Sequence, residues 1–274
     1  MAILTATPIE RDVVIVSGVD AGEYLQTQLT QDVLVLNPGE SAWSFLLEPK
    51  SEIVALLRVT RESDDVFVLD TEPGWGDTVR QTIDQFLFRM DVAFEQATWP
   101  GIAWRGGIPQ EQDAPIVAEV SWSDAVGVDV VGPTVKMPRD ADELVSHSLE
   151  TLRISAGWPR MGTEIEGSAT PAMTGLVDQT ISFDKGCYTG QEFVARVHYR
   201  GVEPPKRLVH IACEADVSLP KGAGIVVDGD EVGTVTSSER GIALGYIKRK
   251  VKTPTNGSVD DVDVEIRPTS TRNT

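Results

Sequence analysis

The sequence predicts an α+β body followed by a small C-terminal β-barrel. Three observations lead to this fold class. Strand-like and amphipathic helical segments alternate up to about residue 98. A strong helical pattern ends at Gly157, and Pro159 prevents its continuation. After Gly201 the helical patterns stop, and short strands separated by turn residues remain, as in a small barrel or sandwich.

The first half of the body is predicted to start with a strand at Val13–Val16. A helix follows, with Asp20 as N-cap and Glu23 in the capping-box position. Its apolar face is formed by Ala21, Tyr24, Leu25 and Leu29. Three extended segments are expected at 42–47, 53–61 and 65–70. A second helix begins near Asp77, with Val79, Ile83, Phe86, Leu87 and Met90 on one stripe, before a strand at 92–94.

The second half of the body has weaker patterns. Residues 100–113 are predicted to form a loop, with one short strand at most. Residues 116–122 and 127–131 are expected to pair as a hairpin. A helix is then predicted from Asp140, with Glu143 in the capping-box position and Leu144, Val145, Leu149 and Leu152 on its apolar face.

Pro204-Pro205 marks the predicted boundary before the barrel. Barrel strands are expected at 207–212, 224–227, 231–237 and 242–247, and Asp228-Gly229 is the clearest hairpin turn. The predicted organisation is therefore a body of residues 1–202 and a barrel of residues 203–274. The body contains two similar α+β subdomains, about 1–98 and 99–202, which can be intertwined.

The composition restricts the compartment and the partners. The two cysteines, Cys187 and Cys213, argue against a disulfide framework and point to a reducing cytoplasm. The N-terminal residues lack the basic region of a signal peptide, and no apolar run approaches the ~20 residues that span a bilayer. The formal net charge of −18 disfavours nucleic acid and anionic lipid. We therefore expect a cytoplasmic chain with no membrane and no direct nucleic-acid partner.

The segment Phe183–Glu192, with the sequence Phe-Asp-Lys-Gly-Cys-Tyr-Thr-Gly-Gln-Glu, carries the strongest chemical signal. A helix is predicted from Gln191, so Cys187 lies near the positive end of a helix dipole. Lys185 adds another positive charge nearby. Both effects favour the thiolate, which could make Cys187 a reactive or metal-contacting sulfur. The alternative is a buried, inert cysteine in a tight turn. Because the chain lacks zinc-type spacings and has two cysteines, no resident metal is predicted.

Lys185–Glu192 resembles the signature of the YgfZ family, the folate-binding relatives of the glycine-cleavage aminomethyltransferase, GcvT. Tyr24–Val33 resembles the first helix of that superfamily. Leu152–Gly157 with Met161–Ile165 resembles its Leu-Arg-x-x-Ala-Gly element, and Gly233–Ser238 resembles a turn of its C-terminal barrel. The resemblance implies a folate-binding α+β body, a β-barrel at the end of the chain and a monomeric state.

The sequence departs from the aminomethyltransferases at one strand. Those enzymes carry an acidic pair where this chain has Ala55 and Leu56, and neither residue can act as a base. The sequence therefore leaves open whether the chain is an enzyme. One alternative function is a folate-dependent aminomethyltransferase or demethylase, with its acid supplied by Glu48, Glu52 or Asp70. Another is an interaction protein that has lost its ligand.

The resemblance implies an accessory protein that binds tetrahydrofolate, or a one-carbon derivative, and supports the assembly or repair of iron–sulfur enzymes. Its partners would be folate and iron–sulfur proteins or their assembly factors, with an indirect effect on tRNA modification. Cys187 is the candidate reactive thiol. The candidate cofactor-binding residues are Phe183 and Tyr188 as walls, Gln191 or Glu192 for the pterin, Arg153 or Arg196 for an anionic group, and Lys185. Arg196 could equally be a surface helix residue, and Arg153 could have a structural partner.

Overall fold

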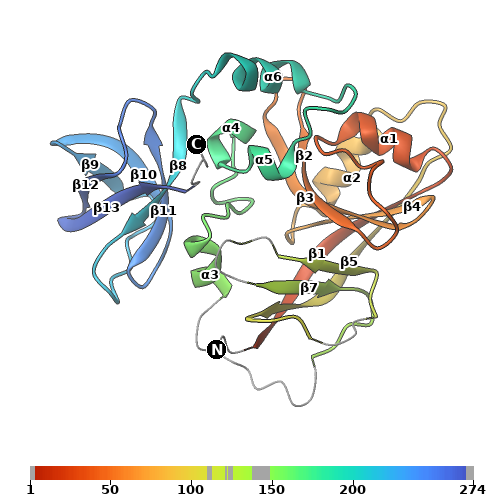
Figure 1. Cartoon of the computed structure of the whole chain (residues 1–274), viewed down its shortest axis with the longest axis horizontal. Coiled ribbons are helices and arrows are strands. Elements are labelled where there is room, and N and C mark those ends of the chain that lie inside the picture. The colour runs from red at the N-terminus through yellow and green to blue at the C-terminus, as the bar shows by residue number, and fades with distance from the viewer. Residues whose placement is uncertain (1–3, 110–112, 121, 123–125, 138–148, 270–274) are drawn as a thin grey trace. The chain divides into compact units, whose positions relative to one another are not determined.

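The computed structural model describes residues 4–109, 113–120, 122, 126–137 and 149–269 (Figure 1). The chain divides into two units, of which the first comprises Met1–Val145 and Asp178–Ala195, and the second Ser146–Val177 and Arg196–Thr274. The predicted barrel, 203–274, lies within the second unit, together with residues 146–177 that the sequence analysis assigned to the body. The predicted boundary at residue 202 and the two subdomains stay predictions.

The described part of the first unit is organised by a seven-stranded antiparallel sheet in the order β2-β3-β4-β1-β5-β7-β6. Its strands are β1 (Thr5–Ser17), β2 (Ser41–Leu47), β3 (Ile53–Ser63), β4 (Val66–Thr71), β5 (Ala93–Arg105), β6 (Ile116–Glu119) and β7 (Gly127–Val131). The two longest strands, β1 and β5, pair over their full lengths, from Thr5 opposite Arg105 to Ser17 opposite Ala93. The predicted strands at 42–47, 53–61 and 65–70 and the hairpin of β6 and β7 are confirmed.

Two helices, α1 (Ala21–Gln28) and α2 (Gly76–Asp84), complete the first half of this unit. The predicted apolar face of α1 is confirmed, because Ala21, Tyr24, Leu25 and Leu29 are all buried. The capping box is wrong: within the described residues the Asp20 carboxylate makes no capping bond to α1 and accepts a hydrogen bond from the Asp91 backbone N–H at 2.7 Å. The predicted stripe of α2 is also too long. The helix ends at Asp84, and the chain then turns back to place Ala93 beside Ser17, which leaves Phe86 exposed.

The prediction of a loop at 100–113 is wrong, since β5 continues to Arg105. Pro100 suggested a strand end because proline cannot donate to a ladder. In the structure its carbonyl accepts a hydrogen bond from Gly132 at 3.1 Å, just beyond the end of β7. Because Pro100 lies at the end of the β5–β7 ladder, its missing N–H removes no hydrogen bond from the middle of the sheet.

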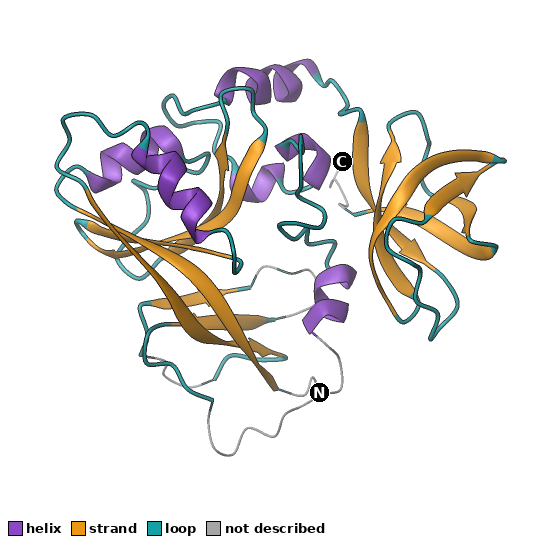
Figure 2. Ribbon diagram, turned by 180° about the vertical axis from the view of Figure 1, so that it is seen from behind, coloured by secondary structure: helices purple, strands orange, loops and turns teal. Residues whose placement is uncertain are grey.

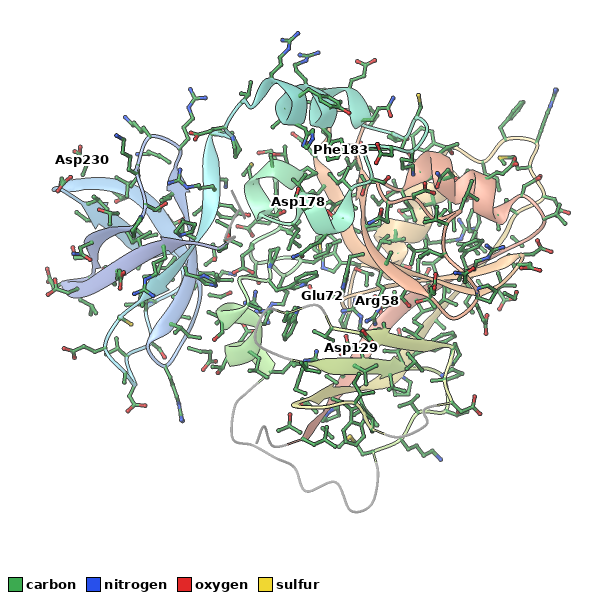
Figure 3. The ribbon with its side chains drawn as sticks, viewed as in Figure 1. Arg58, Glu72, Asp129, Asp178, Phe183 and Asp230 are labelled. Carbon is green, nitrogen blue, oxygen red and sulfur yellow. The ribbon has the colours of Figure 1, made fainter. Side chains whose placement is uncertain are left out.

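The sheet curls so that strands distant in its order approach each other. β3 and β7 are separated by β4, β1 and β5, yet Arg58 Nη1 lies 3.2 Å from Asp129 Oδ2 (Figure 3). The end strands β2 and β6 also contact each other. Arg58 joins the two parts of the curled sheet across its inner side.

Arg58 belongs to a buried network of five charged side chains. Its guanidinium makes a two-point contact with Asp70, with Nε at 2.8 Å and Nη2 at 3.1 Å. Arg11 donates to the same carboxylate at 2.7 Å, and Arg105 donates to Asp129 at 2.9 Å. Burial opposes the charge on Asp70, but Arg58 and Arg11 outweigh it and hold the pKa of this carboxyl below its usual range.

The described part of the second unit contains a closed six-stranded barrel in the order β10-β11-β8-β13-β12-β9, whose far side is seen in Figure 2. Its strands are β8 (Lys206–Ala212), β9 (Gly224–Val227), β10 (Asp230–Glu239), β11 (Ile242–Lys248), β12 (Thr255–Val259) and β13 (Val262–Pro268). The predicted strands β8 to β11 and the Asp228-Gly229 turn are confirmed. β12 and β13 were missed, although Asp260 and Asp261, both at positive φ, form the two-residue turn between them.

The remaining helices are α3 (Leu149–Ser155), α4 (Pro171–Thr174), α5 (Val177–Thr180) and α6 (Gln191–Arg200). The predicted start of α3 at Asp140 and Glu143, with Leu144 and Val145, lies outside the described residues. Its predicted end is confirmed: Gly157 has φ +68 and its N–H bonds the Ile154 carbonyl at 2.9 Å. Within the described residues, no helix combines the length and the apolar character that a membrane span requires.

Replacing Arg58 by methionine should lower the free energy of unfolding by about 3–5 kcal/mol, because Asp70 and Asp129 lose a buried partner. Urea unfolding at pH 7 measures the loss. The matched control is Arg80→Met, which removes a partly exposed pair with Asp84 four residues away and should cost less than about 1 kcal/mol.

The loss should also depend on pH. Because the folded pKa of Asp70 is depressed, the contribution of Asp70 to the free energy of unfolding is complete above the unfolded pKa of about 3.9 and is lost as pH falls through the folded value. The difference between wild type and Arg58→Met should therefore narrow in acid. Equal losses from both substitutions at pH 7 would contradict the prediction.

Candidate functional site

The segment from Phe183 to Gly190 forms a loop of the first unit that is tied to two distant parts of the same unit. The backbone N–H of Ser182 bonds the Thr30 carbonyl at 3.0 Å, and that of Thr189 bonds the Thr27 carbonyl at 3.1 Å. On the other side, the Ser51 hydroxyl donates to the Gly190 carbonyl. We call residues 183–190 the signature loop. Its position is fixed by the end of α1 and by the turn between β2 and β3.

Lys185 makes the strongest of these ties. Its ammonium donates to the carbonyls of Leu29 at 2.7 Å and Gln31 at 2.8 Å. Nζ also lies 5.3 Å from the centroid of the Tyr188 ring. Burial lowers the pKa of Lys185 to about 8, although Asp32 opposes the shift. The side chain therefore stays mainly protonated at pH 7 and holds the loop by charged hydrogen bonds.

Cys187 and Tyr188 are neighbours with opposite environments. Cys187 is exposed, so the alternative of a buried cysteine is wrong. Tyr188 is 9% exposed, and burial raises the pKa of its phenol to about 12. The loop thus presents a thiol to solvent while an aromatic ring anchors it from within. The thiolate character of Cys187 stays a prediction.

The end of the signature loop depends on a glycine. Gly190 has φ +83, and a Cβ there would lie 2.7 Å from the Glu48 carbonyl oxygen. Immediately after it, the Gln191 side chain accepts a hydrogen bond from the Tyr188 N–H at 3.3 Å, and α6 begins at Gln191 as predicted. Glu192, one residue further, is exposed.

Asp70, one of the acids proposed for one-carbon transfer, is poorly placed for proton transfer. Ala55 and Leu56 are buried in β3. Asp70 is fully buried between two guanidinium groups, and its pKa is lowered. Glu48 is exposed, and its backbone N–H bonds the Glu52 carbonyl in the β2–β3 turn.

Arg153 lies in the second unit, where it has structural partners, as the sequence analysis allowed. It donates to Glu150 at 2.7 Å, to Glu164 at 3.0 Å and to the Ser237 hydroxyl at 2.7 Å. The Ser237 hydroxyl itself donates to Glu164 at 2.6 Å. The network joins α3 to barrel strand β10.

The structure therefore brings Lys185, Tyr188 and the exposed Cys187 together in the signature loop, and Gln191 at the start of α6 accepts a hydrogen bond from it. Phe183 is half-buried at the start of the same loop, whereas Arg196 is exposed on α6. The roles of these residues in binding a cofactor stay predictions.

The sequence analysis missed the Arg58 network, although an arginine inside the apolar run of β3 was a signal for a buried ion pair. Among the described residues, no cluster of His, Cys, Asp and Glu side chains has the arrangement of a metal site.

Comparisons with known proteins agree with this architecture. A family model described as the C-terminal β-barrel domain of CAF17 matches residues 206–271. The chain is 25% identical to the tRNA-modifying protein YgfZ of Vibrio vulnificus, over 76% of this chain and 72% of that protein. It is 28% identical to a protein of Haemophilus influenzae, over 81% and 80% of the two chains. The crystal structure of glycine cleavage system aminomethyltransferase T from Bartonella henselae superimposes with a TM-score of 0.79 at 18% identity, covering 97% of this chain and 86% of that one.

The class defined by these findings is the aminomethyltransferase fold, with mixed helices and strands and a closed C-terminal barrel. Within that fold the chain is similar to YgfZ proteins, at 24% and 25% identity over about three quarters of its length. The predicted fold class and the resemblance are both confirmed.

Replacing Gly190 by alanine should lower the free energy of unfolding by about 1–3 kcal/mol, because it forces an L-residue to a positive φ and against a carbonyl. The matched control is Gly186→Ala in the same loop, where a Cβ would meet no described atom within 4 Å. This control should change stability by less than about 0.5 kcal/mol. Denaturant unfolding compares the two variants, and equal losses would show that the close approach of Gly190 to Glu48 has no energetic role.

Proposed function

We propose that this chain is a tetrahydrofolate-binding accessory protein that supports the assembly or repair of iron–sulfur enzymes. The observation that carries the proposal is the signature loop, in which Lys185 and Tyr188 hold the exposed Cys187 in a defined position. The likeness to YgfZ over most of the chain supports a folate-binding role of the YgfZ type. Its effect on tRNA would be indirect, through iron–sulfur enzymes, which suits a chain with a net charge of −18.

The folate part of the proposal assigns the pterin to the face of the first unit near the signature loop. Phe183 and Tyr188 supply aromatic surface, and the exposed Glu192 supplies a carboxylate for the donor edge of a pterin. Gln191 is already used by the Tyr188 N–H, so we assign it to loop support. Tetrahydrofolate, or a one-carbon derivative, is the ligand.

The iron–sulfur part assigns Cys187 to contact with a sulfur, an iron or a thiol of a partner protein. An exposed thiol on a fixed loop is accessible to a docked partner, whereas Cys213 is partly covered and burial raises the pKa of its thiol. We place this activity in the cytoplasm and expect a monomer.

One-carbon transfer is the alternative, and the shared fold with an aminomethyltransferase favours it. The buried Ala55 and Leu56 and the paired Asp70 argue against it, because a general base needs a pKa near the working pH. Formation of methylenetetrahydrofolate from tetrahydrofolate and an S-aminomethyl donor by the purified chain, with release of ammonia and the free thiol, would establish the transferase instead.

Tetrahydrofolate should bind the purified chain at one site in titration calorimetry. Replacing Phe183 by leucine should weaken binding about three- to tenfold, because an aromatic wall contributes about 0.5–1.5 kcal/mol beyond its buried area. The control is Phe193→Leu, which changes an exposed aromatic residue on α6 and should leave the affinity unchanged. Absence of binding to the wild-type chain would rule out the folate assignment and favour an interaction protein without this ligand.

Replacing Cys187 by serine should lower the activity of iron–sulfur enzymes in cells that depend on this protein, while the chain still folds and binds tetrahydrofolate. Cys213→Ser is the matched control and should support wild-type enzyme activity. Enzyme activities and folate affinity are measured on the same variants. Full enzyme activity with Cys187→Ser would remove the thiol from the mechanism without affecting the folate result.

A further inference from the structure

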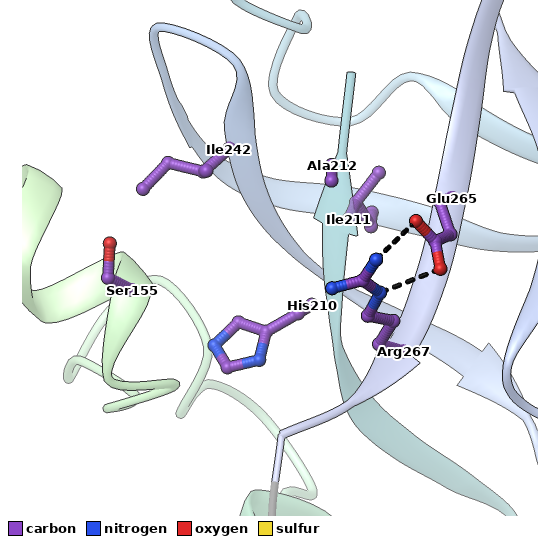
Figure 4. Close-up of a pocket in the computed structure, with 7 residues that line it drawn as sticks. All are labelled: Ser155, His210, Ile211, Ala212, Ile242, Glu265 and Arg267. Atoms are coloured by element: carbon purple, nitrogen blue, oxygen red, sulfur yellow. Dashed lines mark hydrogen bonds and ion pairs between the residues drawn. The ribbon is translucent and has the colours of Figure 1, made fainter. Parts of the chain in front are cut away.

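A cavity of about 210 Å³ lies in the second unit, between the end of α3 and the outer wall of the barrel (Figure 4). Its lining residues come from α3, β8, β11 and β13 and are Ser155, His210, Ile211, Ala212, Ile242, Glu265 and Arg267. An apolar cavity of ~150 Å³ accommodates benzene. This cavity therefore has room for a small ligand with a branched aliphatic chain or a single ring.

The cavity has one apolar side and one charged side. Ala212 and Ile242 supply the apolar side, whereas the Ile211 side chain is 1% exposed and packs into the barrel core. On β13, Glu265 and Arg267 lie directly opposite Ala212 and His210 of β8, so their side chains share the outer face of the barrel. Figure 4 shows the Glu265–Arg267 pair beside the His210 ring.

The charged side of the cavity carries one positive side chain, Arg267, and one negative side chain, Glu265. Arg267 contacts Glu265 through Nε at 2.7 Å and Nη2 at 2.6 Å, and the two side chains are 60% and 40% exposed. An ion pair this exposed is weak and can exchange its partners with a ligand. A monoanionic ligand would place two carboxylates on one guanidinium, and a monocationic ligand would bring two cations to one carboxylate. A zwitterion avoids both, because its carboxylate faces Arg267 while its ammonium faces Glu265.

His210 adds a fixed polar group. Its Nε2 lies 3.0 Å from the Ile154 carbonyl, and a carbonyl can only accept, so Nε2 is the donor. In the neutral ring, Nδ1 is then an acceptor, which suits a ligand with an N–H donor. Ser155, at the end of α3, offers a hydroxyl in the same cavity.

We propose that this cavity binds a small zwitterion with an apolar side chain, of the class of the aliphatic α-amino acids. The carboxylate pairs with Arg267, the ammonium pairs with Glu265, and the aliphatic chain contacts Ile242 and Ala212. The site lies wholly in the second unit and does not depend on folate binding or on Cys187.

NMR titration of the full chain with L-leucine, followed on isoleucine methyl signals, tests the proposal. The signal of Ile242 should shift with a dissociation constant on the order of 1 mM. Two probes of the same skeleton isolate the charges: 4-methylpentanoate lacks the ammonium, and 3-methylbutylamine lacks the carboxylate. Each should bind at least about tenfold more weakly than leucine. Equal binding of either probe, or no response to leucine, would overturn the proposal.

Single substitutions test whether leucine binds in this cavity. Arg267→Gln and Glu265→Gln should each weaken leucine binding about tenfold, and Ile242→Trp should abolish it by filling the cavity. Arg249→Gln changes an exposed arginine of the same unit and should leave binding unchanged. Unchanged thermal unfolding shows that the Arg267 and Glu265 variants are folded, as expected for exposed side chains. Wild-type affinity in both of these variants would show that leucine binds elsewhere.

Discussion

The ion pair between Arg58 and Asp129 fixes the shape of the first unit, because it joins strands that three other strands separate. Burying five charged groups has a large desolvation free energy, which is offset only while each carboxylate keeps its arginine partners. The pair therefore holds β3 in place. Since Ser51 lies at the turn before β3 and donates to the Gly190 carbonyl, the position of the signature loop follows from the same constraint.

Lys185 connects this framework to the thiol. Its ammonium binds the carbonyls of Leu29 and Gln31, at the end of α1, where the helix dipole favours a positive charge. The contact links segments 156 residues apart in the chain. It also explains why a charged side chain is drawn inward while Cys187, two residues later, stays at the surface. The contacts of Lys185 thus support the loop that exposes Cys187.

Elements with a clear local pattern could be predicted from the sequence, and elements set by distant partners could not. The segments at 42–47 and 53–61 have apolar β-type runs and form β2 and β3. Asp20 failed as a capping residue because Asp91, distant in sequence, offers its N–H. β5 passes Pro100 because β1 pairs with it along its whole length. At the site, sequence resemblance located the signature loop, but the network around Arg58 requires partners on four strands that no spacing predicts.

The same network bears on the choice between binding and catalysis. A carboxylate that moves protons near neutral pH needs a pKa close to the working pH and an open face toward its substrate. Asp70 has neither, because Arg58 and Arg11 occupy its oxygens and lower its pKa in a fully buried position. The ion pairs that shape the sheet therefore prevent Asp70 from taking part in proton transfer. With Asp70 committed to this network, the exposed carboxylate of Glu192 lies just beyond the ordered aromatic and thiol loop, a position that suits contact with a bound ligand.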